Sequence, residues 1–314
     1  MKSHYIFNEG NMKATTKKGF WKTAVDKDHV GYIYIFPALF ILAVFVIVPL
    51  FTAFYLSLTN LDIFFSNFKF IGFDNFINSF NDDRVRNAFK NTIIYVGLNV
   101  PLQLALALAI AFLVYKPHKV NKIFRTIYYI PVLCSFTAVG ILFQLLFDQT
   151  VGYYSYVISL FTGKVIGIFS SAKLALPAII FISIWRNFGR SMIIYVAGIL
   201  DIPKTYFEAS AIDGASRTQQ FFHIMLPNLL PTISFTLLTT IISSFQVFDV
   251  VFVTTGGGPL YKTETLVQYI YLRGFSDPFD LGYASAVAVE LFLVIAIITI
   301  FFKRILDKKI EKNF

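Results

Sequence analysis

The segment DIPKTYFEASAIDGASRTQQFFHIMLP, residues 201–227, is the one sizeable polar stretch between two strongly apolar halves of the chain. Pro203 suits the first turn of a helix, because its φ is already helical and its missing N–H needs no partner there. Asp201 or Ile202 would then be the cap of this helix. Its later residues are mostly small, which would let another surface approach closely.

The same segment contains a second helix start. Gly214 supplies a left-handed stop about ten residues after the first helix begins. Ser216 and Gln219 have the spacing of a capping box, in which each side chain satisfies a backbone N–H of the other residue. Pro227 would mark where the chain leaves this second helix. The sequence therefore predicts two short, exposed helices joined by a glycine turn.

Outside this segment the composition is that of a polytopic membrane protein. Of the 314 residues, 56% are hydrophobic and 14% are charged, against about 25% charged in soluble domains. The single cysteine, Cys134, excludes a disulfide framework within the chain and a cysteine-based metal site. We therefore expect an all-α membrane protein with six transmembrane helices. They are predicted at 32–56, 93–114, 127–147, 174–200, 229–253 and 281–302.

These spans divide the chain into three parts. Residues 1–30 form a polar, lysine-bearing leader without the apolar core and cleavage site of a signal peptide. Residues 31–303 form the transmembrane domain, with a short interfacial helix expected between its first two spans. Residues 304–314 form a tail.

The basic residues indicate the orientation. Of 27 Lys and Arg, 17 lie in the leader, the second connection, the 201–227 loop and the tail, and 8 lie in the other loops. Cytoplasmic loops carry the excess of basic residues, so both termini and the 201–227 loop are predicted to be cytoplasmic. The excess of positive charge thus reflects the orientation of the chain in the membrane and does not indicate nucleic-acid binding.

Within the loop, Glu208-Ala209-Ser210 is followed by Gly214 and, after nine further residues, by Ile224-Met225-Leu226-Pro227. This spacing resembles the EAA loop of ABC-importer permeases, with serine in place of the second alanine. The resemblance implies a type I ABC importer permease fold, in which the loop is a coupling helix that docks into a groove of an ATPase dimer. The implied coupling residues are Phe207, Glu208, Ala209, Ser210, Ala211, Ile212, Asp213, Gly214 and Ala215.

Phe207 and Ile212 are expected to be the apolar anchors of that docking. Taken alone, Glu208 could equally be an ordinary surface acid. The chain has no Gly-rich nucleotide-binding loop, so we expect ATP and Mg²⁺ on a separate ATPase subunit and no cofactor on this chain.

A second signature follows the fifth span. F-x-x-F-D at 245–249, followed by T-G-G-G-P at 255–259, is similar to the carbohydrate-uptake branch of these permeases, the maltose and glycerol-phosphate type. The resemblance implies a second homologous permease, an extracytoplasmic solute-binding protein, a carbohydrate substrate and a bacterial cytoplasmic membrane. Residues 261–278 would cap the outer mouth of the pathway.

Polar side chains inside spans usually face a cavity or a partner helix, because burying them in lipid is costly. Ser183, Asn187 and Arg190 share one face of span four. Alignment with the family's sugar-contacting helices points to Ser183, Asn187, Ser244 and Gln246. With the charged residues of the same two spans added, the predicted substrate pathway is Ser183, Asn187, Arg190, Ser244, Gln246 and Asp249. Hydrogen bonding between helices is the alternative role for each residue.

Two arginines in span four leave two interpretations open. Arg186 and Arg190 could pair with Asp249 or Glu290, which would be a structural role. They could instead select an anionic sugar.

Other functions have less support. An ion-coupled secondary transporter would need paired intramembrane carboxylates, for which Asp249 and Glu290 are the only candidates, together with inverted repeats. A membrane enzyme would need an acid–base pair at one depth, and none is evident. The four histidines are far apart, so no metal site is expected.

Overall fold

A computed structural model of the chain describes residues 27–64, 68–163, 165–276 and 278–312. The described residues are helical, with no strand and only two isolated β-bridges. The chain divides into two compact units, Met1–Thr52 and Ala53–Phe314. Most of the predicted leader lies outside the described residues.

The first unit holds most of one candidate membrane span, whose last four residues belong to the second unit. α2 (Lys27–Leu42) continues through a π-helix, η1 (Ala43–Ile47), into α3 (Val48–Leu56). An apolar stretch of 23 residues is long enough to cross a bilayer. The helix over 32–56 is as predicted, and the π-turn precedes Pro49, which cannot donate a backbone hydrogen bond.

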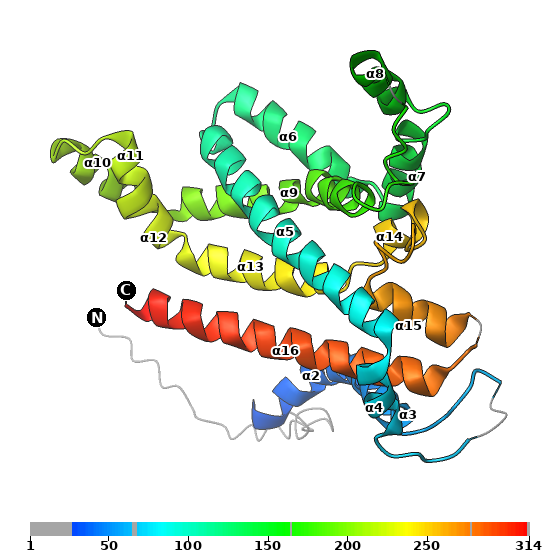
Figure 1. The fold of residues 1–314 in the computed structure, drawn as a ribbon. Coiled ribbons are helices and arrows are strands. Elements are labelled where there is room, and N and C mark those ends of the chain that lie inside the picture. Colours follow the sequence, from blue (N-terminus) through cyan, green and yellow to red (C-terminus); the bar gives the residue numbers. More distant parts are fainter. Residues whose placement is uncertain (1–26, 65–67, 164, 277, 313–314) are drawn as a thin grey trace, which may run out of the picture. The chain divides into compact units, whose positions relative to one another are not determined.

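The second unit is built around two long helices. α5 (Asp83–Val114) packs against α9 (Ala175–Asp201), and α13 (Leu230–Phe245) packs on both. α16 (Leu281–Glu311) lies along α13, and α15 (Leu266–Phe275) lies along the start of α16, as Figure 1 shows. α16 runs without a break past residue 303, the predicted end of the transmembrane domain, into the predicted tail.

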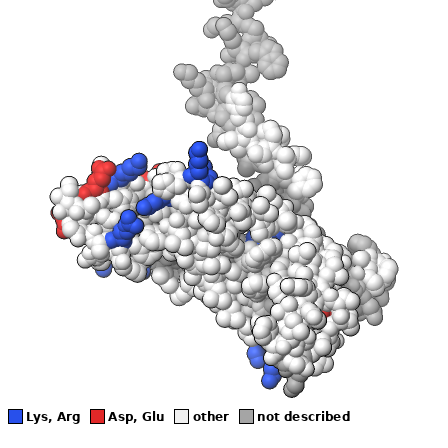
Figure 2. All heavy atoms as spheres, turned by 90° about the horizontal axis from the view of Figure 1, so that it is seen from above, with Lys and Arg blue, Asp and Glu red and all other residues white. Residues whose placement is uncertain are grey.

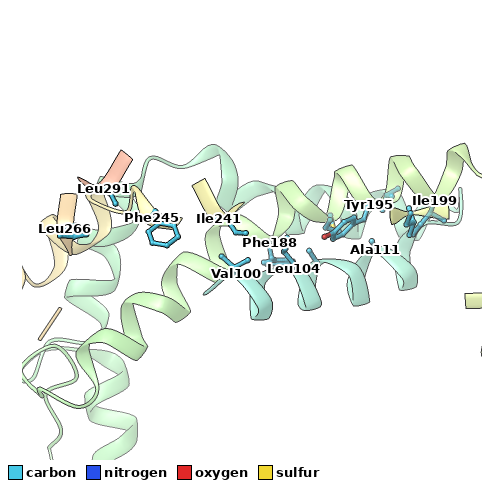
Figure 3. Close-up of a cluster of buried hydrophobic side chains, with 14 of the residues drawn as sticks. Val100, Leu104, Ala111, Phe188, Tyr195, Ile199, Ile241, Phe245, Leu266 and Leu291 are labelled. Atoms are coloured by element: carbon cyan, nitrogen blue, oxygen red, sulfur yellow. The ribbon is translucent and has the colours of Figure 1, made fainter. Parts of the chain in front are cut away.

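The core of this unit lies between α5 and α9. Val100, Leu104 and Ala111 of α5 face Phe188 and Tyr195 of α9, as seen in Figure 3. Lipid tails are as apolar as leucine, so close packing and hydrogen bonds, more than hydrophobic transfer, hold membrane helices together. The core includes alanines with no exposed surface, which lets the two helices approach closely.

The third predicted span, 127–147, is not a straight helix. The structure forms α6 (Lys119–Leu133) and α7 (Phe136–Leu146), bent by 94° at Cys134 and Ser135. Pro131 lies in the last turn of α6, two residues before this helix ends at Leu133. The Ser135 hydroxyl then accepts the backbone N–H of Ala138 at 3.1 Å and so caps α7. The described residues thus contain five candidate spans, or six where this bent pair is counted as one broken span.

The remaining short helices connect these elements. α4 (Asp74–Asn81) precedes α5, and α8 (Tyr153–Thr162) follows α7. α14 (Asp249–Thr254) follows a break in the fifth span after α13. The 201–227 loop forms α10 (Lys204–Ile212) and α11 (Arg217–Gln220), which continues through the π-helix η2 (Phe221–Met225) into α12 (Leu226–Asn228).

The local predictions for this loop are partly confirmed. Gly214 adopts the left-handed conformation, with φ +80°, and Ser216 and Gln219 form both hydrogen bonds of the capping box. Pro227 does not end the second helix. It lies in the first turn of α12, where its missing N–H is tolerated, and the helical path runs on to α13 with only a turn at Leu229.

The predicted start of the first loop helix is also wrong. Pro203 is the cap of α10 and lies outside its first turn, because α9 extends to Asp201 and ends on Ile202. The backbone of Ile202 is extended, with ψ 126°, as is usual for a residue that precedes proline.

Candidate functional site

A half-open cavity of about 180 Å³ lies among the long helices of the second unit. Its wall comes from α5, α9, α13 and the break that leads into α14. Amide and hydroxyl side chains make up much of this wall, together with two arginines and one carboxylate. The polar lining groups are Tyr95, Asn99, Gln103, Arg186, Asn187, Arg190, Ser191, Thr236, Thr239, Thr240, Ser243, Ser244, Gln246 and Asp249.

Five of the six residues predicted for the substrate pathway line this cavity. They are Asn187 and Arg190 of α9, Ser244 of α13, Gln246 of the break and Asp249 of α14. Ser183 does not line it. This serine is fully buried next to Tyr95, one turn of α9 away from the cavity wall. Ser183 therefore has no surface on this cavity in the structure.

The contribution of α5 was missed by the sequence analysis. Asn99 is 2% exposed and donates from Nδ2 to Oγ of Ser244 at 3.0 Å and, more weakly, to Oε1 of Gln103 at 3.4 Å. Its Oδ1 has no hydrogen-bond partner among the described residues. Two amides four residues apart in an apolar span were the available signal, since that spacing places them on one helix face.

Arg186 is held by the chain itself. Its guanidinium donates to the carbonyl oxygen of Cys134 at 2.8 and 3.1 Å and lies 3.9 Å from the ring centre of Phe136. Nη1 donates to Oδ1 of Asn187 at 2.8 Å. These contacts join the α6–α7 bend to α9, supply a partner for a carbonyl near the end of α6, and orient the Asn187 amide.

Neither arginine pairs with an acid as the sequence had suggested. Among the described residues, no ion pair joins Arg186 or Arg190 to Asp249 or Glu290. Glu290 instead accepts a hydrogen bond from the Ser79 hydroxyl of α4 and does not line the cavity. Asp249 lines the same cavity without pairing with either arginine, and Glu290 is bound to α4, so the structural interpretation of an arginine–carboxylate ion pair is not seen among the described residues.

The predicted coupling residues lie in α10 and in the turn that follows it, and α10 and α11 together form an exposed knob. Acidic and basic side chains gather at this end of the molecule in Figure 2, and Lys204, Glu208, Asp213 and Arg217 are all exposed. The two predicted anchors differ. Ile212 is 87% exposed, whereas Phe207 is half-buried and packs against the chain's own core. Of the two predicted anchors, Ile212 is therefore the one with the more exposed side chain.

A second polar network ties α5 to the segment around α15. Glu264 is fully buried and accepts hydrogen bonds from Nη2 and Nε of Arg84 at 2.7 and 2.9 Å. Asp82 accepts from the Tyr269 hydroxyl at 2.7 Å and from the Tyr283 hydroxyl at 3.0 Å. Burial raises the pKa of Asp82, but these hydrogen bonds and the backbone N–H groups of α5 lower it below its ordinary value.

The described residues contain no cluster of three or more His, Cys, Asp and Glu side chains that could hold a metal ion.

Most of the chain is similar to known proteins. Residues 81–312 match the family profile described as binding-protein-dependent transport system inner membrane component. YesP of Bacillus subtilis (strain 168), a probable ABC transporter permease protein, is 35% identical over 282 residues, which cover 88% of this chain and 90% of YesP.

Two further similarities extend this result. UgpA of Yersinia pestis, an sn-glycerol-3-phosphate transport system permease protein, is 29% identical over 89% of this chain and 95% of its own length. A crystal structure of a bacterial ABC transporter involved in the import of the acidic polysaccharide alginate superposes with a TM-score of 0.80. It covers 92% of this chain and 98% of the compared chain at 24% identity, so it shows the same fold.

Proposed function

The chain belongs to the family of binding-protein-dependent transport system inner membrane components, and we propose on that premise that it is one of two permease subunits of an ATP-driven saccharide importer. A second, homologous permease completes the pathway across the bacterial cytoplasmic membrane. An ATPase dimer supplies the energy, and an extracytoplasmic binding protein delivers the substrate.

The observation that carries the saccharide assignment is the polar cavity among candidate membrane spans. Saccharides offer many hydroxyl groups, which need donors and acceptors in fixed positions, and apolar C–H faces, which stack on aromatic rings. The cavity provides amides on α5, on α9 and in the break after α13, together with the rings of Tyr95, Phe136 and Phe248. Polar groups at this depth are costly unless they serve a pathway or a partner helix.

The exposed knob formed by α10 and α11 supports the coupling part of the proposal. In this mechanism the ATPase dimer closes on ATP and moves α10, and the attached α9 and α13 rotate with it. Both helices line the cavity, so motion of the knob would change which side of the membrane the cavity faces. The glycine turn and the capping box make the knob rigid enough to transmit such a push.

A secondary transporter is disfavoured by the position of its candidate carboxylates. Asp249 lines the cavity, whereas Glu290 lies outside its wall and is bound to Ser79. The two acids therefore do not form the shared ion site that such a mechanism requires.

Coupling is tested by co-purification of the ATPase subunit. Replacement Ile212→Ala should weaken binding by about 2 kcal/mol, the loss typical of an exposed anchor that becomes buried at an interface. The matched control is Ile77→Ala, which removes an isoleucine 58% exposed on α4. The amount of ATPase retained on the affinity-purified permease is measured, together with ATP-dependent saccharide uptake.

Loss of the ATPase with Ile212→Ala and retention with Ile77→Ala supports the proposal. If both variants retained the same amount of the ATPase, the proposed coupling role of α10 would be wrong. Saccharide uptake by purified permease alone, driven by a proton gradient, would overturn the assignment as an ATP-driven importer.

A further inference from the structure

We infer that the substrate of this cavity is an anionic saccharide and that Arg190 binds its carboxylate or phosphate group. This inference rests on the proposed function and adds the charge of the substrate. The evidence is the difference between two arginines on one helix, combined with the hydrogen-bonding groups that surround them.

The two arginines lie one turn apart on α9, and both line the cavity. Arg186 is bound to the Cys134 carbonyl and to Asn187, and it stacks on Phe136, so its position is set by the fold. Arg190 is exposed to the cavity and makes no hydrogen bond or ion pair with any described residue. The contacts of Arg186 thus account for its position in the fold, whereas no contact with a described residue accounts for Arg190.

An arginine without a partner within a membrane span is costly, because the guanidinium must be kept solvated or paired. Its five N–H donors form a planar fork that matches the two oxygens of a carboxylate or a phosphate. A neutral sugar could be bound by amides alone, without the cost of holding a charge there. Arg190 is therefore best explained by a negative charge on the substrate.

The rest of the wall fits the neutral part of such a substrate. The Oδ1 of Asn99 is buried, unpaired among the described residues, and belongs to a cavity-lining side chain. A sugar hydroxyl that donates to this oxygen would satisfy it. The amides of Asn187 and Gln246 and the hydroxyl of Ser243 offer further donors and acceptors.

Asp249 is the one acid in the wall and must be reconciled with an anionic substrate. It lies at the start of α14, where the helix dipole stabilises a negative charge. It makes no ion pair with Arg190 in this structure. With two arginines and one acid, the cavity keeps a net positive charge, so it attracts an anion even with Asp249 ionised.

The test measures uptake by the complete transporter in cells for three radiolabelled probes. They are a uronate disaccharide, its carboxyl-reduced neutral counterpart and a hexose phosphate. Arg190→Gln should lower uptake of the anionic probe that wild type carries by roughly ten- to hundredfold, the effect of losing a hydrogen bond to a charged group. Arg190→Lys, which keeps the charge, should lose less. The control Arg304→Gln, on the exposed end of α16, should match wild type.

The outcomes separate this inference from the proposed function. If Arg190→Gln selectively loses uptake of the uronate or of the hexose phosphate while the amount of assembled complex stays normal, the inference is supported and the anion is identified. The inference is overturned if the wild type takes up only the neutral disaccharide, or if Arg190→Gln takes up the anionic probe as well as the wild type does. The proposed function as a saccharide importer would stand in both cases. Uptake of none of the probes counts against the saccharide assignment itself.

A second possibility is that Arg190 forms an ion pair with Asp249 when the cavity closes. In that case Asp249→Asn would reproduce the defect of Arg190→Gln, and both variants would impair every transported probe equally. That result would also overturn the inference.

Discussion

Gly189 is the residue at which α9 approaches α6 most closely. A Cβ atom at this position would lie 2.2 Å from the carbonyl oxygen of Tyr128, so no side chain fits without moving one helix. We predict that Gly189→Ala destabilises the protein by about 1–3 kcal/mol, the usual cost of overpacking. The loss is measured as a lower melting temperature of the detergent-solubilised complex.

Gly97 of α5 is the matched control, because a Cβ atom there would meet nothing within 4 Å. Gly97→Ala should leave stability unchanged or raise it slightly, since alanine favours helix more than glycine does. Equal melting temperatures for the two variants would contradict the close approach of α6 and α9. The sequence shows glycine in both helices, and only the packing distinguishes the roles of Gly97 and Gly189.

At the scale of single elements, the capping box at the start of α11 is open to a direct test. The Ser216 hydroxyl accepts the backbone N–H of Gln219 at 3.3 Å, and the Gln219 side chain accepts the N–H of Ser216 at 2.8 Å. Ser216→Ala should cost about 0.5–2 kcal/mol of local stability. Hydrogen exchange of the amides in α11 is the measurement, with faster exchange expected.

The control is Thr218→Ala, on the exposed side of the same helix, where no cap is lost. Exchange in α11 should then stay close to that of the wild type. Faster exchange in both variants to the same extent would show that the box does not hold the helix end. The sequence predicted this feature because a capping box involves residues only three apart, and no distant packing is needed to form it.

Elements that depend on distant partners were predicted less well. The 94° bend between α6 and α7 involves Pro131 and Ser135, which are visible in the sequence, but also the Arg186 guanidinium, 52 residues away from Cys134. Hydropathy alone cannot distinguish a straight span from a bent pair, because both contain the same apolar residues.

For the whole molecule, the predicted orientation places both termini and the 201–227 loop in the cytoplasm. The one native cysteine, Cys134, can be replaced by serine, and a single cysteine then reports the side of the membrane. Asn81→Cys should react with a membrane-impermeant maleimide in intact cells. Thr218→Cys should react only after the cells are permeabilised. Both native residues are exposed.

The reverse labelling pattern would invert the orientation and would place α10 on the side opposite to any cytoplasmic ATPase. Labelling of Thr218→Cys in inside-out vesicles is the positive control for its reactivity.

The sequence by itself determined the composition, the apolar spans, the polar loop and the local caps within it. These features depend on residues that are near one another in the chain, so hydropathy and short-range hydrogen bonding are enough to predict them. Five of the six residues predicted for the pathway line the cavity. The resemblance to a permease family pointed to Asn187, Ser244 and Gln246, and helical spacing placed Asn187 and Arg190 on one face.

Only the tertiary structure decided which helices meet. It brought Asn99 and Gln103 of α5 into the cavity wall and buried Ser183 beside Tyr95, outside that wall. It also gave Arg186 a structural role and left Arg190 facing the cavity. These outcomes depend on contacts between residues far apart in sequence, and the relative placement of helices, which fixes those contacts, is not encoded in any single helix.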